Sequence, residues 1–314
     1  MRKRQTLTAL RAFEAVARHN SFTLAASELI VTRPAISKQV RLLEENLNCQ
    51  LLIRTNNEIE LTTAGIELFN GLRQAFDLIA ATTKRISTRS RDNMSINILV
   101  ERDFASSWLA ERIGQFLLQH PGISIEINAE HNDELRFEED FSFRIFYRGK
   151  KFCPEFFQQQ LLCHWIDIPL CTPEYAKEHI LASNNLESAH LIIDRTYDPW
   201  QDWFHYSKQS VPCNQEPQTL FNETTLCLNA ALAGGGVAIG DSILGFSSML
   251  AGNLIPPFKA GLKSEEAYLI LTPKEVQLTR AEKVFEGWLL DTMEQYQQSA
   301  RSYFESQSIV IIER

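Results

Sequence analysis

Apolar residues in the first 46 positions recur every three or four residues, which is the spacing of amphipathic helices. The spacing predicts one helix over residues 7–17 and two shorter helices between residues 23 and 46, joined by a tight turn. Ser21 is expected to cap the first helix of this pair and Thr32 the second, where Pro34 lies in the first turn. The pattern predicts a helix-turn-helix, although an ordinary αα-hairpin with a solvated basic face fits the same spacing.

The second helix of the pair carries cations and hydroxyl groups on one side. Ile36, Val40 and Leu43 form its apolar stripe, which leaves the other side chains free to face outward. In helix-turn-helix proteins the N-terminal end of this helix enters the major groove of DNA. The predicted DNA-contacting residues on it are Thr32, Arg33, Pro34, Ser37, Lys38 and Arg41.

Two short strands are expected next, at residues 51–54 and 58–61, around a turn at Asn56 and Asn57. We refer to this hairpin as the wing. It places Arg54 at its base, where the side chain can contact a phosphate, reach into the minor groove or simply be solvated.

A long helix is predicted from Thr62 or Thr63 to about residue 88, and its apolar residues follow a heptad spacing. This seam favours a dimer interface, because one helix-turn-helix reads few bases and two-fold dimers read two half-sites. Packing of a single amphipathic helix against its own domain gives the same pattern. The predicted seam residues are Phe69, Leu72, Phe76, Ile79 and Ile86.

The pattern changes after a polar stretch at residues 87–93, which predicts a hinge. Buried strands are expected at residues 95–100, 123–127 and 143–147, and strands and helices then alternate up to a last amphipathic helix at residues 282–302. This alternation is typical of an α/β domain with a parallel sheet. The apolar segment at residues 308–312 receives no assignment.

The net charge of −8 conceals a division along the chain. Residues 1–93 hold 14 Lys and Arg against 9 Asp and Glu, a charge of +5, whereas the remainder holds 17 against 30, a charge of −13. The basic part can meet phosphates, and the acidic part is repelled by DNA. The sequence has neither a run of 18 apolar residues nor the pattern of a signal peptide, so a cytoplasmic protein without membrane contact is expected.

The sequence carries no recognisable catalytic or metal-binding motif. The patterns H-E-x-x-H, G-x-S-x-G and the P-loop are all missing, and residues 234–236 form a glycine run that follows a predicted helix and is typical of a helix end. The six cysteines are scattered without a C-x-x-C pair, which predicts reduced thiols. We therefore expect neither an enzyme nor a protein with a cofactor or metal.

The segment LRAFEAVARHNSFTLAASELIVTRPAISKQVRLLEENLNCQLLIR, followed by LTTAG, resembles the LysR-type transcriptional regulators. The segments FLLQHPGISIEI, LCTPEY and ALAGGGVAIG extend the resemblance over the chain, and LNCQLLIR and LCTPEYA are similar to the branch that regulates β-lactamase induction and glycine cleavage. The resemblance implies a multidomain α+β protein. It would have a winged helix-turn-helix at residues 1–62, a dimerising linker helix and hinge at 63–93, and a two-lobed α/β effector domain like a periplasmic binding protein at 94–314. Lobe I is expected at about 94–165 and 272–300, and lobe II at 166–271.

In this family an effector binds between the lobes. The resemblance points to the loop Glu101–Ser107, which opens a helix whose N-terminus would bind an anion, yet Arg102 and Asp103 stand where relatives often carry Gly, Ser or Thr. Asp103 would then cap its own helix, or pair with Arg102 and partly fill the cleft, or face a cationic effector. Asn222 is the expected cap of a lobe II helix. The predicted effector-binding residues are Arg102, Asp103, Ser106, Asn128, Tyr147, Asn222, Thr224, Thr225 and Tyr268.

On the DNA side, Arg33 stands where many relatives carry Gln or His, and Arg suits a bidentate contact with guanine. We expect Lys38 and Arg41 mainly to hold phosphates. The implied partners are double-stranded DNA, a second copy of the chain in a homodimer and then a homotetramer, a small-molecule effector and RNA polymerase. A regulator that responds instead to pH, redox state or protein contacts is a second interpretation, and a solute-binding protein is a third.

Overall fold

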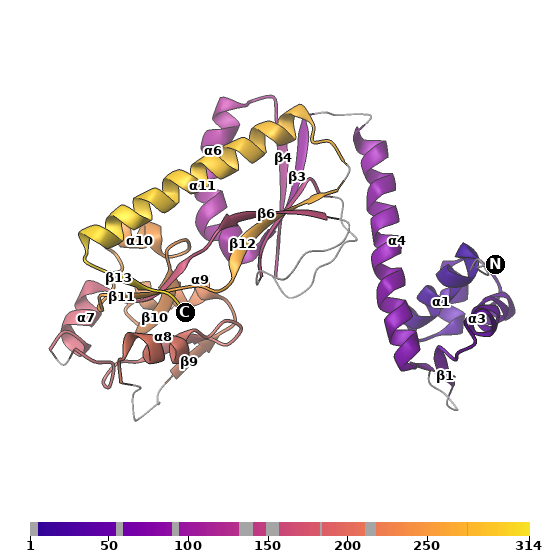
Figure 1. Ribbon diagram of the computed structural model, residues 1–314, viewed down its shortest axis with the longest axis horizontal. Coiled ribbons are helices and arrows are strands. Elements are labelled where there is room, and N and C mark those ends of the chain that lie inside the picture. Colours follow the sequence, from indigo (N-terminus) through magenta and orange to yellow (C-terminus); the bar gives the residue numbers. More distant parts are fainter. Residues whose placement is uncertain are drawn as a thin grey trace. The chain divides into compact units, whose positions relative to one another are not determined.

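Figure 1 shows the protein as a computed structural model. The structure describes residues 6–54, 59–89, 94–131, 141–148, 157–182, 184–210, 218–274 and 276–314. The chain divides into two compact units, with the change between them near residue 91, and each is considered by itself. Among the described helices, none has the length and apolar character needed to cross a membrane.

The N-terminal unit is a winged helix-turn-helix followed by a long helix. Ser21 caps α2 as expected, since its hydroxyl accepts the Leu24 N–H at 3.3 Å. Thr32 occupies the N-cap position of α3, but its side chain makes no capping hydrogen bond. The elements are α1 (Leu7–His19), α2 (Phe22–Glu28), α3 (Arg33–Leu47), β1 (Leu52–Arg54), β2 (Ile59–Leu61) and α4 (Thr63–Arg89).

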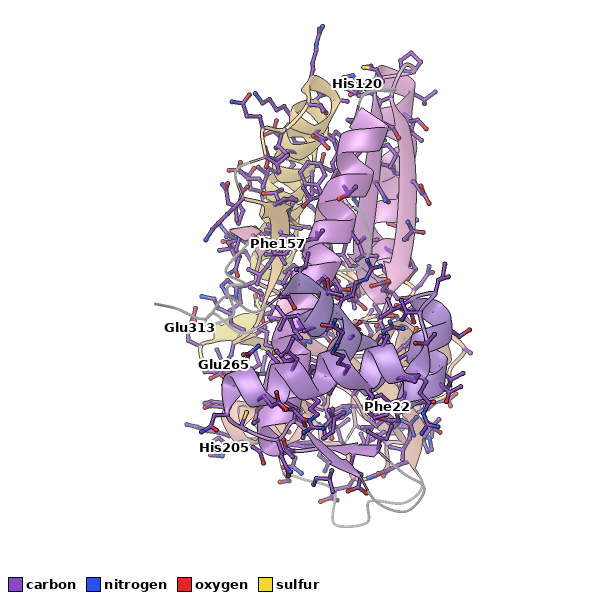
Figure 2. The ribbon with its side chains drawn as sticks, turned by 90° about the vertical axis from the view of Figure 1, so that its right-hand side faces the viewer. Phe22, His120, Phe157, His205, Glu265 and Glu313 are labelled. Carbon is purple, nitrogen blue, oxygen red and sulfur yellow. The ribbon has the colours of Figure 1, made fainter. Side chains whose placement is uncertain are left out.

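The core of this unit forms where α1, α2 and α3 meet. Phe22, which begins α2 (Figure 2), is 7% exposed and packs into this core. The predicted stripe of α3 is confirmed, because Ile36, Val40 and Leu43 are all buried. Burial of one face of α3 leaves its other face to solvent.

Two polar contacts join the helices to the wing, in which β1 and β2 pair antiparallel. The carboxylate of Glu44 in α3 accepts the N–H groups of Leu51 and Leu52 at 2.9 and 3.2 Å. The hydroxyl of Thr62 accepts the Gly65 N–H at 3.0 Å and so caps α4. The wing is therefore held at both of its ends, and the turn at Asn56 and Asn57 lies outside the described residues.

The predicted seam of α4 divides into two parts. Leu72 is 8% exposed and belongs to the core of the N-terminal unit, against which Phe69 and Phe76 also pack. Ile79 is 53% exposed, and the side chain of Ile86 lies outside the described residues. Packing of the helix against its own domain therefore accounts for Phe69, Leu72 and Phe76. Among the seam residues whose side chains the structure describes, Ile79 is the one that remains available to a partner.

The C-terminal unit has two lobes, as expected. Lobe I contains a five-stranded sheet in the order β4-β3-β5-β12-β6. Phe116 of α6 and Phe285 of α11 pack against each other with ring centroids 5.5 Å apart in the buried core of this lobe. Its elements are β3 (Ser95–Glu101), α5 (Arg102–Phe104), a π-helical turn (Ala105–Leu109), α6 (Ala110–Gln119), β4 (Ser124–Glu130), β5 (Phe143–Arg148), β6 (Phe157–Cys163), β12 (Ala267–Pro273) and α11 (Arg280–Ser306).

Lobe II contains a six-stranded sheet in the order β13-β11-β7-β10-β8-β9. Cys171, Trp200 and Trp203 are among the residues of a second buried cluster in this lobe. Its elements are β7 (Ile166–Leu170), α7 (Pro173–His179), β8 (Leu191–Asp194), α8 (Trp200–Ser207), β9 (Gln218–Phe221), α9 (Thr224–Leu232), β10 (Val237–Asp241), α10 (Phe246–Leu250), β11 (Ala260–Lys263) and β13 (Val310–Ile312).

Both sheets are mixed, which corrects the expectation of a parallel sheet. In lobe I, β3 is parallel to β4 and β5, whereas β12 is antiparallel to β5 and β6. The chain returns to lobe I slightly before the boundary expected at about residue 271, because β12 begins at Ala267 and lies in the sheet of lobe I. The strand returns from the other lobe, and this return reverses its direction in the sheet.

The unassigned tail has a defined place. After α11 the chain crosses to lobe II once more, and β13 pairs parallel with β11 at the edge of the sheet. The tail ends in Arg314, whose guanidinium lies 2.9 Å from the carboxylate of Asp167. The apolar segment therefore forms an edge strand of this sheet. Ile309, directly before the strand, is buried, whereas Val310 and Ile311 remain exposed.

Gly65 gives a test of the junction between the wing and α4. A Cβ atom at Gly65 would lie 2.1 Å from the Leu51 carbonyl oxygen, which accepts the Thr62 N–H at 3.0 Å. We expect Gly65→Ala to destabilise the N-terminal unit by about 1–3 kcal/mol, since either the junction or the helix must shift. Gly71→Ala is the matched control, because a Cβ there meets nothing within 4 Å and alanine should stabilise the helix by about 0.5–1 kcal/mol. Urea unfolding of both variants checks this, and equal effects would contradict it.

Candidate functional site

The exposed face of α3 is the first candidate site. Thr32, Arg33, Pro34 and Lys38 are exposed and Ser37 is half-buried. Arg41 is exposed as well, but its guanidinium pairs with Glu45 one turn later, at 2.9 Å. The structure therefore brings together all the predicted residues of α3 on one surface.

Two residues outside α3 also bear on this candidate site, Arg54 in the wing and Ile30 in the turn before α3. The backbone of Arg54 ends strand β1, and its side chain lies outside the described residues. Ile30, in the turn before α3, is 91% exposed and has a φ angle of 54°. A left-handed conformation is unfavourable for a β-branched residue, and this one gains no burial in return. Strained positions of this kind cluster at functional sites.

The cleft between the two lobes of the C-terminal unit is the second candidate site. Its first wall is the start of the helix that follows β3. The Glu101 carboxylate accepts the N–H groups of Asp103 and Phe104 at 3.0 and 2.9 Å, so Glu101 caps this helix. The expectation that Asp103 caps its own helix is wrong, because Asp103 points to the other lobe.

Asp103 reaches the N-terminus of α9 in lobe II. Its Oδ2 accepts the N–H of Thr224 at 2.9 Å, and the Thr224 hydroxyl donates to Asp194 Oδ2 at the same distance. A helix N-terminus carries partial positive charge and exposes N–H groups, which favours a carboxylate there. Asn222 is therefore not the cap of α9. Glu223 holds that position without a side-chain capping bond, and lobe I supplies the carboxylate instead.

Two more polar contacts cross the cleft beside Asp103. Arg102 forms an ion pair with Glu223, which corrects the expected pairing of Arg102 with Asp103. Ser107 Oγ lies 3.2 Å from Thr225 Oγ1. Three residues within the segment 102–107 of lobe I thus contact three consecutive residues of lobe II, and the cleft is held closed by charge and hydrogen bonds.

The space that remains in the closed cleft is about 30 Å³. This volume holds a water molecule and is far below the roughly 300–1,000 Å³ of a small-molecule pocket. Among the predicted residues, Ser106, Asn128 and Thr225 do not line it. The residues that do are Glu101, Arg102, Asp103, His131, Tyr147, Trp165, Asp194, Thr196, Tyr197, Asn222, Glu223, Thr224, Asp241, Leu244 and Tyr268.

Sequence reasoning missed several of these lining residues. Asp194 and Asp241 are the last residues of β8 and β10, which lie side by side in parallel. Carboxyl ends of parallel strands are the usual place of ligand contacts in α/β domains, so that signal was available. Trp165 and Tyr197 carried no comparable signal, because neither belongs to a strand or helix.

Burial perturbs the acidic groups of the cleft. Glu101, Asp103 and Asp241 are 8%, 8% and 6% exposed. Desolvation is the main cause that raises the pKa of Glu101 to about 7, with the charge of Asp103 adding to it. Burial likewise raises the pKa of Asp241 to about 7 and raises the pKa of Asp103. The closed cleft therefore concentrates carboxylates where water cannot screen them.

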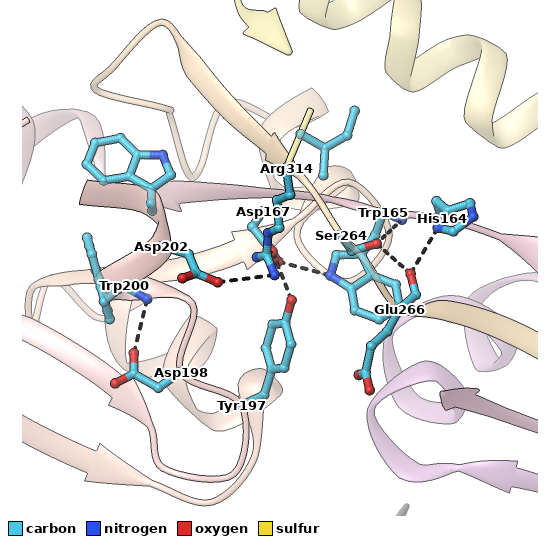
Figure 3. Close-up of polar contacts among 12 residues, drawn as sticks. His164, Trp165, Asp167, Tyr197, Asp198, Trp200, Asp202, Ser264, Glu266 and Arg314 are labelled. Carbon is cyan, nitrogen blue, oxygen red and sulfur yellow. Dashed lines mark hydrogen bonds and ion pairs between the residues drawn. The ribbon is translucent and has the colours of Figure 1, made fainter. Parts of the chain in front are cut away.

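A buried network behind the cleft fixes two of its aromatic walls, as Figure 3 shows. Asp167 accepts hydrogen bonds from Trp165 Nε1 at 2.9 Å and from the Tyr197 hydroxyl at 2.8 Å. The Arg314 guanidinium pairs with the same carboxylate at 2.9 Å and lies 3.4 Å from Asp202. The end of the chain thus contributes the positive charge beside the carboxylate that orients both rings.

The cysteines give no sign of a redox or metal centre among the described residues. Cys49, Cys163, Cys171 and Cys227 are free thiols. Burial raises the pKa of Cys171 and of Cys227 to about 12, which makes them poor nucleophiles. No group of three metal-ligating side chains occurs in the part of the chain that the structure describes.

Comparison with known proteins identifies both halves of the chain. Residues 7–66 match the bacterial regulatory helix-turn-helix protein, lysR family, and residues 89–294 match the LysR substrate binding domain. The chain is 30% identical over 306 residues to the glycine cleavage system transcriptional activator of Escherichia coli, covering 95% of this chain and 97% of that one. It is 32% identical over 289 residues to the HTH-type transcriptional activator AmpR of Enterobacter cloacae, covering 91% and 97%.

Solved structures share the fold. The AmpR effector binding domain from Citrobacter freundii superposes with a TM-score of 0.55 at 23% identity, covering 64% of this chain and 98% of that one. Full-length LysG from Corynebacterium glutamicum with bound effector Arg superposes with a TM-score of 0.62 at 15% identity, covering 92% and 98%. At these identities the likeness shows the architecture alone.

The raised pKa of Glu101 predicts how stability depends on pH. The ordinary pKa of 4.5 rises to about 7 in the folded protein, so the folded state holds a proton that the unfolded chain has released. Between these values stability falls as pH rises, and Glu101→Gln removes this loss. The free energy of unfolding of the variant, relative to that of the wild type, should therefore be about 2 kcal/mol higher at pH 8 than at pH 5.

Chemical denaturation at the two pH values measures this difference. Glu187→Gln, at an exposed position, is the control and should follow the wild type at both. A difference between Glu101→Gln and the wild type that stays constant with pH would contradict the raised pKa of Glu101.

Proposed function

Because the chain belongs to the LysR family of bacterial regulatory helix-turn-helix proteins, we propose that Arg33 reads a base while Lys38 and Arg41 hold DNA phosphates. The chain is a DNA-binding transcriptional regulator with an effector-binding domain. One observation carries the assignment of roles: Arg33 lies at the first position of α3 and is exposed, above a stripe that is fully buried. That end of the helix enters the major groove, where Arg can pair with guanine O6 and N7.

The difference between the cations of α3 supports separate roles. Arg41 already pairs with Glu45, so contact with DNA exchanges one partner for another. Among the described residues, no ion pair reaches Arg33 or Lys38, and both are exposed. An unpaired cation releases more free energy on meeting a phosphate or a base, since no existing pair is broken.

We also propose that the protein acts as a homodimer through the open part of α4 and that the interlobe cleft modulates it. Regulators of this family bind DNA and form oligomers. Ile79 supports a partner on this helix, because 53% exposure is high for a large apolar residue on a heptad seam. A homotetramer and contact with RNA polymerase remain extensions of this proposal.

The proposed roles of Arg33 and Lys38 predict different effects of their substitution on DNA binding. The test uses a duplex that the wild type selects from a random library, together with its single-base variants. Arg33→Ala should weaken binding about 10–100-fold and flatten the preference at one position in each half-site. Lys38→Ala should weaken binding evenly and lower the salt slope by about one. Lys177→Ala, in the C-terminal unit, controls for loss of charge. An even loss with Arg33→Ala would assign Arg33 to the phosphates.

Ile79 tests the dimer. Ile79→Lys should weaken self-association at least about tenfold, because each subunit then places a charge in the proposed interface, where the dimer would bury the Ile79 side chain. Folding should survive, because the side chain is half exposed within its own chain. Asn70→Lys adds the same charge to an exposed position off the seam and should leave association unchanged. Sedimentation velocity measures both, and a dimer that persists in Ile79→Lys would contradict this interface.

A further inference from the structure

The cleft that we propose as the effector site is lined by more carboxylates than it needs for its own structure. Four of the five have hydrogen-bond or ion-pair partners that belong to the folded chain, and none of their oxygens is left buried without one among the described residues. Glu101 caps α5, Asp194 binds Thr196 and Thr224, and Asp241 accepts N–H groups of the turn that follows it. Glu223 pairs with Arg102. These carboxylates are explained by folding.

Asp103 is the exception. Its Oδ2 accepts the Thr224 N–H at 2.9 Å. Burial raises the pKa of this carboxyl, and the nearby Thr225 side chain opposes that rise. Among the described residues, however, no donor lies within hydrogen-bonding geometry of Asp103 Oδ1. The side chain is 8% exposed and lines the cleft. A buried carboxylate oxygen without a donor is costly, and a ligand that supplies an N–H or a positive charge removes that cost.

The same geometry disfavours an anionic ligand. The N-terminus of α9 is the natural seat for an anion, and the Asp103 carboxylate already occupies it. A second anion would have to displace Asp103 and would then lie among Glu101, Asp194 and Glu223. Like charges repel strongly at contact distances where the effective dielectric is low, so an anion there would be disfavoured.

Aromatic rings complete the lining. Tyr147, Trp165, Tyr197 and Tyr268 all border the space, and Trp165 lies 5.3 Å from Tyr268 and 5.9 Å from Tyr197 between ring centroids. Most of these rings meet edge to face, so their faces turn in different directions. Aromatic faces attract ammonium and guanidinium groups through the ring quadrupole. Carboxylates with aromatic faces are the combination that recognises an organic cation.

Arg102 also lines the cleft. Its side chain is 49% exposed and forms an ion pair with Glu223. The remaining space of about 30 Å³ has no room for a second guanidinium or ammonium group. A ligand must therefore displace Arg102 or part the lobes, and either change breaks the contacts that hold the cleft closed.

We propose that the effector of this protein carries an ammonium or guanidinium group, which binds to Asp103 Oδ1 among the aromatic rings of the cleft. The inference rests on the proposed role of the cleft as the effector site. It assigns Asp103 two tasks, as the internal anion of α9 in the closed form and as the counter-ion of the ligand in the bound form. Release of the Arg102–Glu223 pair would then report ligand binding to the rest of the domain.

Matched pairs of probes test the proposal on the full chain at pH 8. Choline is compared with its neutral isostere 3,3-dimethyl-1-butanol, butylguanidinium with butylurea, and butyrate serves as the anion. At least one cation at millimolar concentration should raise the melting temperature of the wild type by about 2–4 °C, and its neutral counterpart should not. Titration calorimetry should show binding of that cation weakened at least about tenfold by Asp103→Asn and by Tyr147→Leu.

Asp291→Asn, at an exposed position on α11, is the control and should keep the response. A circular dichroism spectrum like that of the wild type keeps the two cleft variants interpretable. Equal stabilisation by a neutral probe or by butyrate would overturn the proposal, as would an undiminished response in Asp103→Asn or no response to either cation. Each of these results leaves duplex binding intact, whereas failure of the wild type to bind a selected duplex would count against the proposed function itself.

Discussion

The contact between the Asp103 carboxylate and the N-terminus of α9 is the interaction on which the closed C-terminal unit depends. It joins the first helix of lobe I to a helix of lobe II, and the pairs Arg102–Glu223 and Ser107–Thr225 flank it. A carboxylate at a helix N-terminus gains from the helix dipole, but burial beside Glu101 opposes this gain. Closure therefore balances a favourable contact against crowded negative charge, and a small change in charge can shift that balance.

The tail adds a second constraint on the same cleft. Asp167 is 1% exposed and would be costly as an isolated charge. Arg314, Tyr197 and Trp165 share its two oxygens, so the chain end, the lobe II sheet and the cleft walls form one network. Burial raises the pKa of Asp167 to about 7 in spite of this guanidinium. Strand β13 thus serves to deliver Arg314 as well as to cover the edge of the sheet.

Local periodicity predicted the N-terminal unit well because its elements are decided locally. The stripe of α3 and the capping of α2 by Ser21 follow from neighbours within a few residues. Strand direction in the mixed sheets, the lobe boundary near Ala267 and the role of the tail depend on contacts between distant segments. Spacing alone carries no such information, so these features could not be predicted from it.

The two residues that departed from the family pattern are where sequence reasoning failed most informatively. Of the three expectations for these residues, Arg102 and Asp103, the local cap and the local pair are wrong, because both side chains bind lobe II, 121 residues further along the chain. The third, a cationic effector, stays a prediction. Locally inconsistent residues are expected at functional sites, because they answer to partners outside their own element. The Asp103 carboxylate occupies the N-terminus of α9, where an anion could otherwise bind. The contact that disfavours an anionic ligand therefore also leaves Asp103 Oδ1 as the acceptor that the proposed cationic effector would meet.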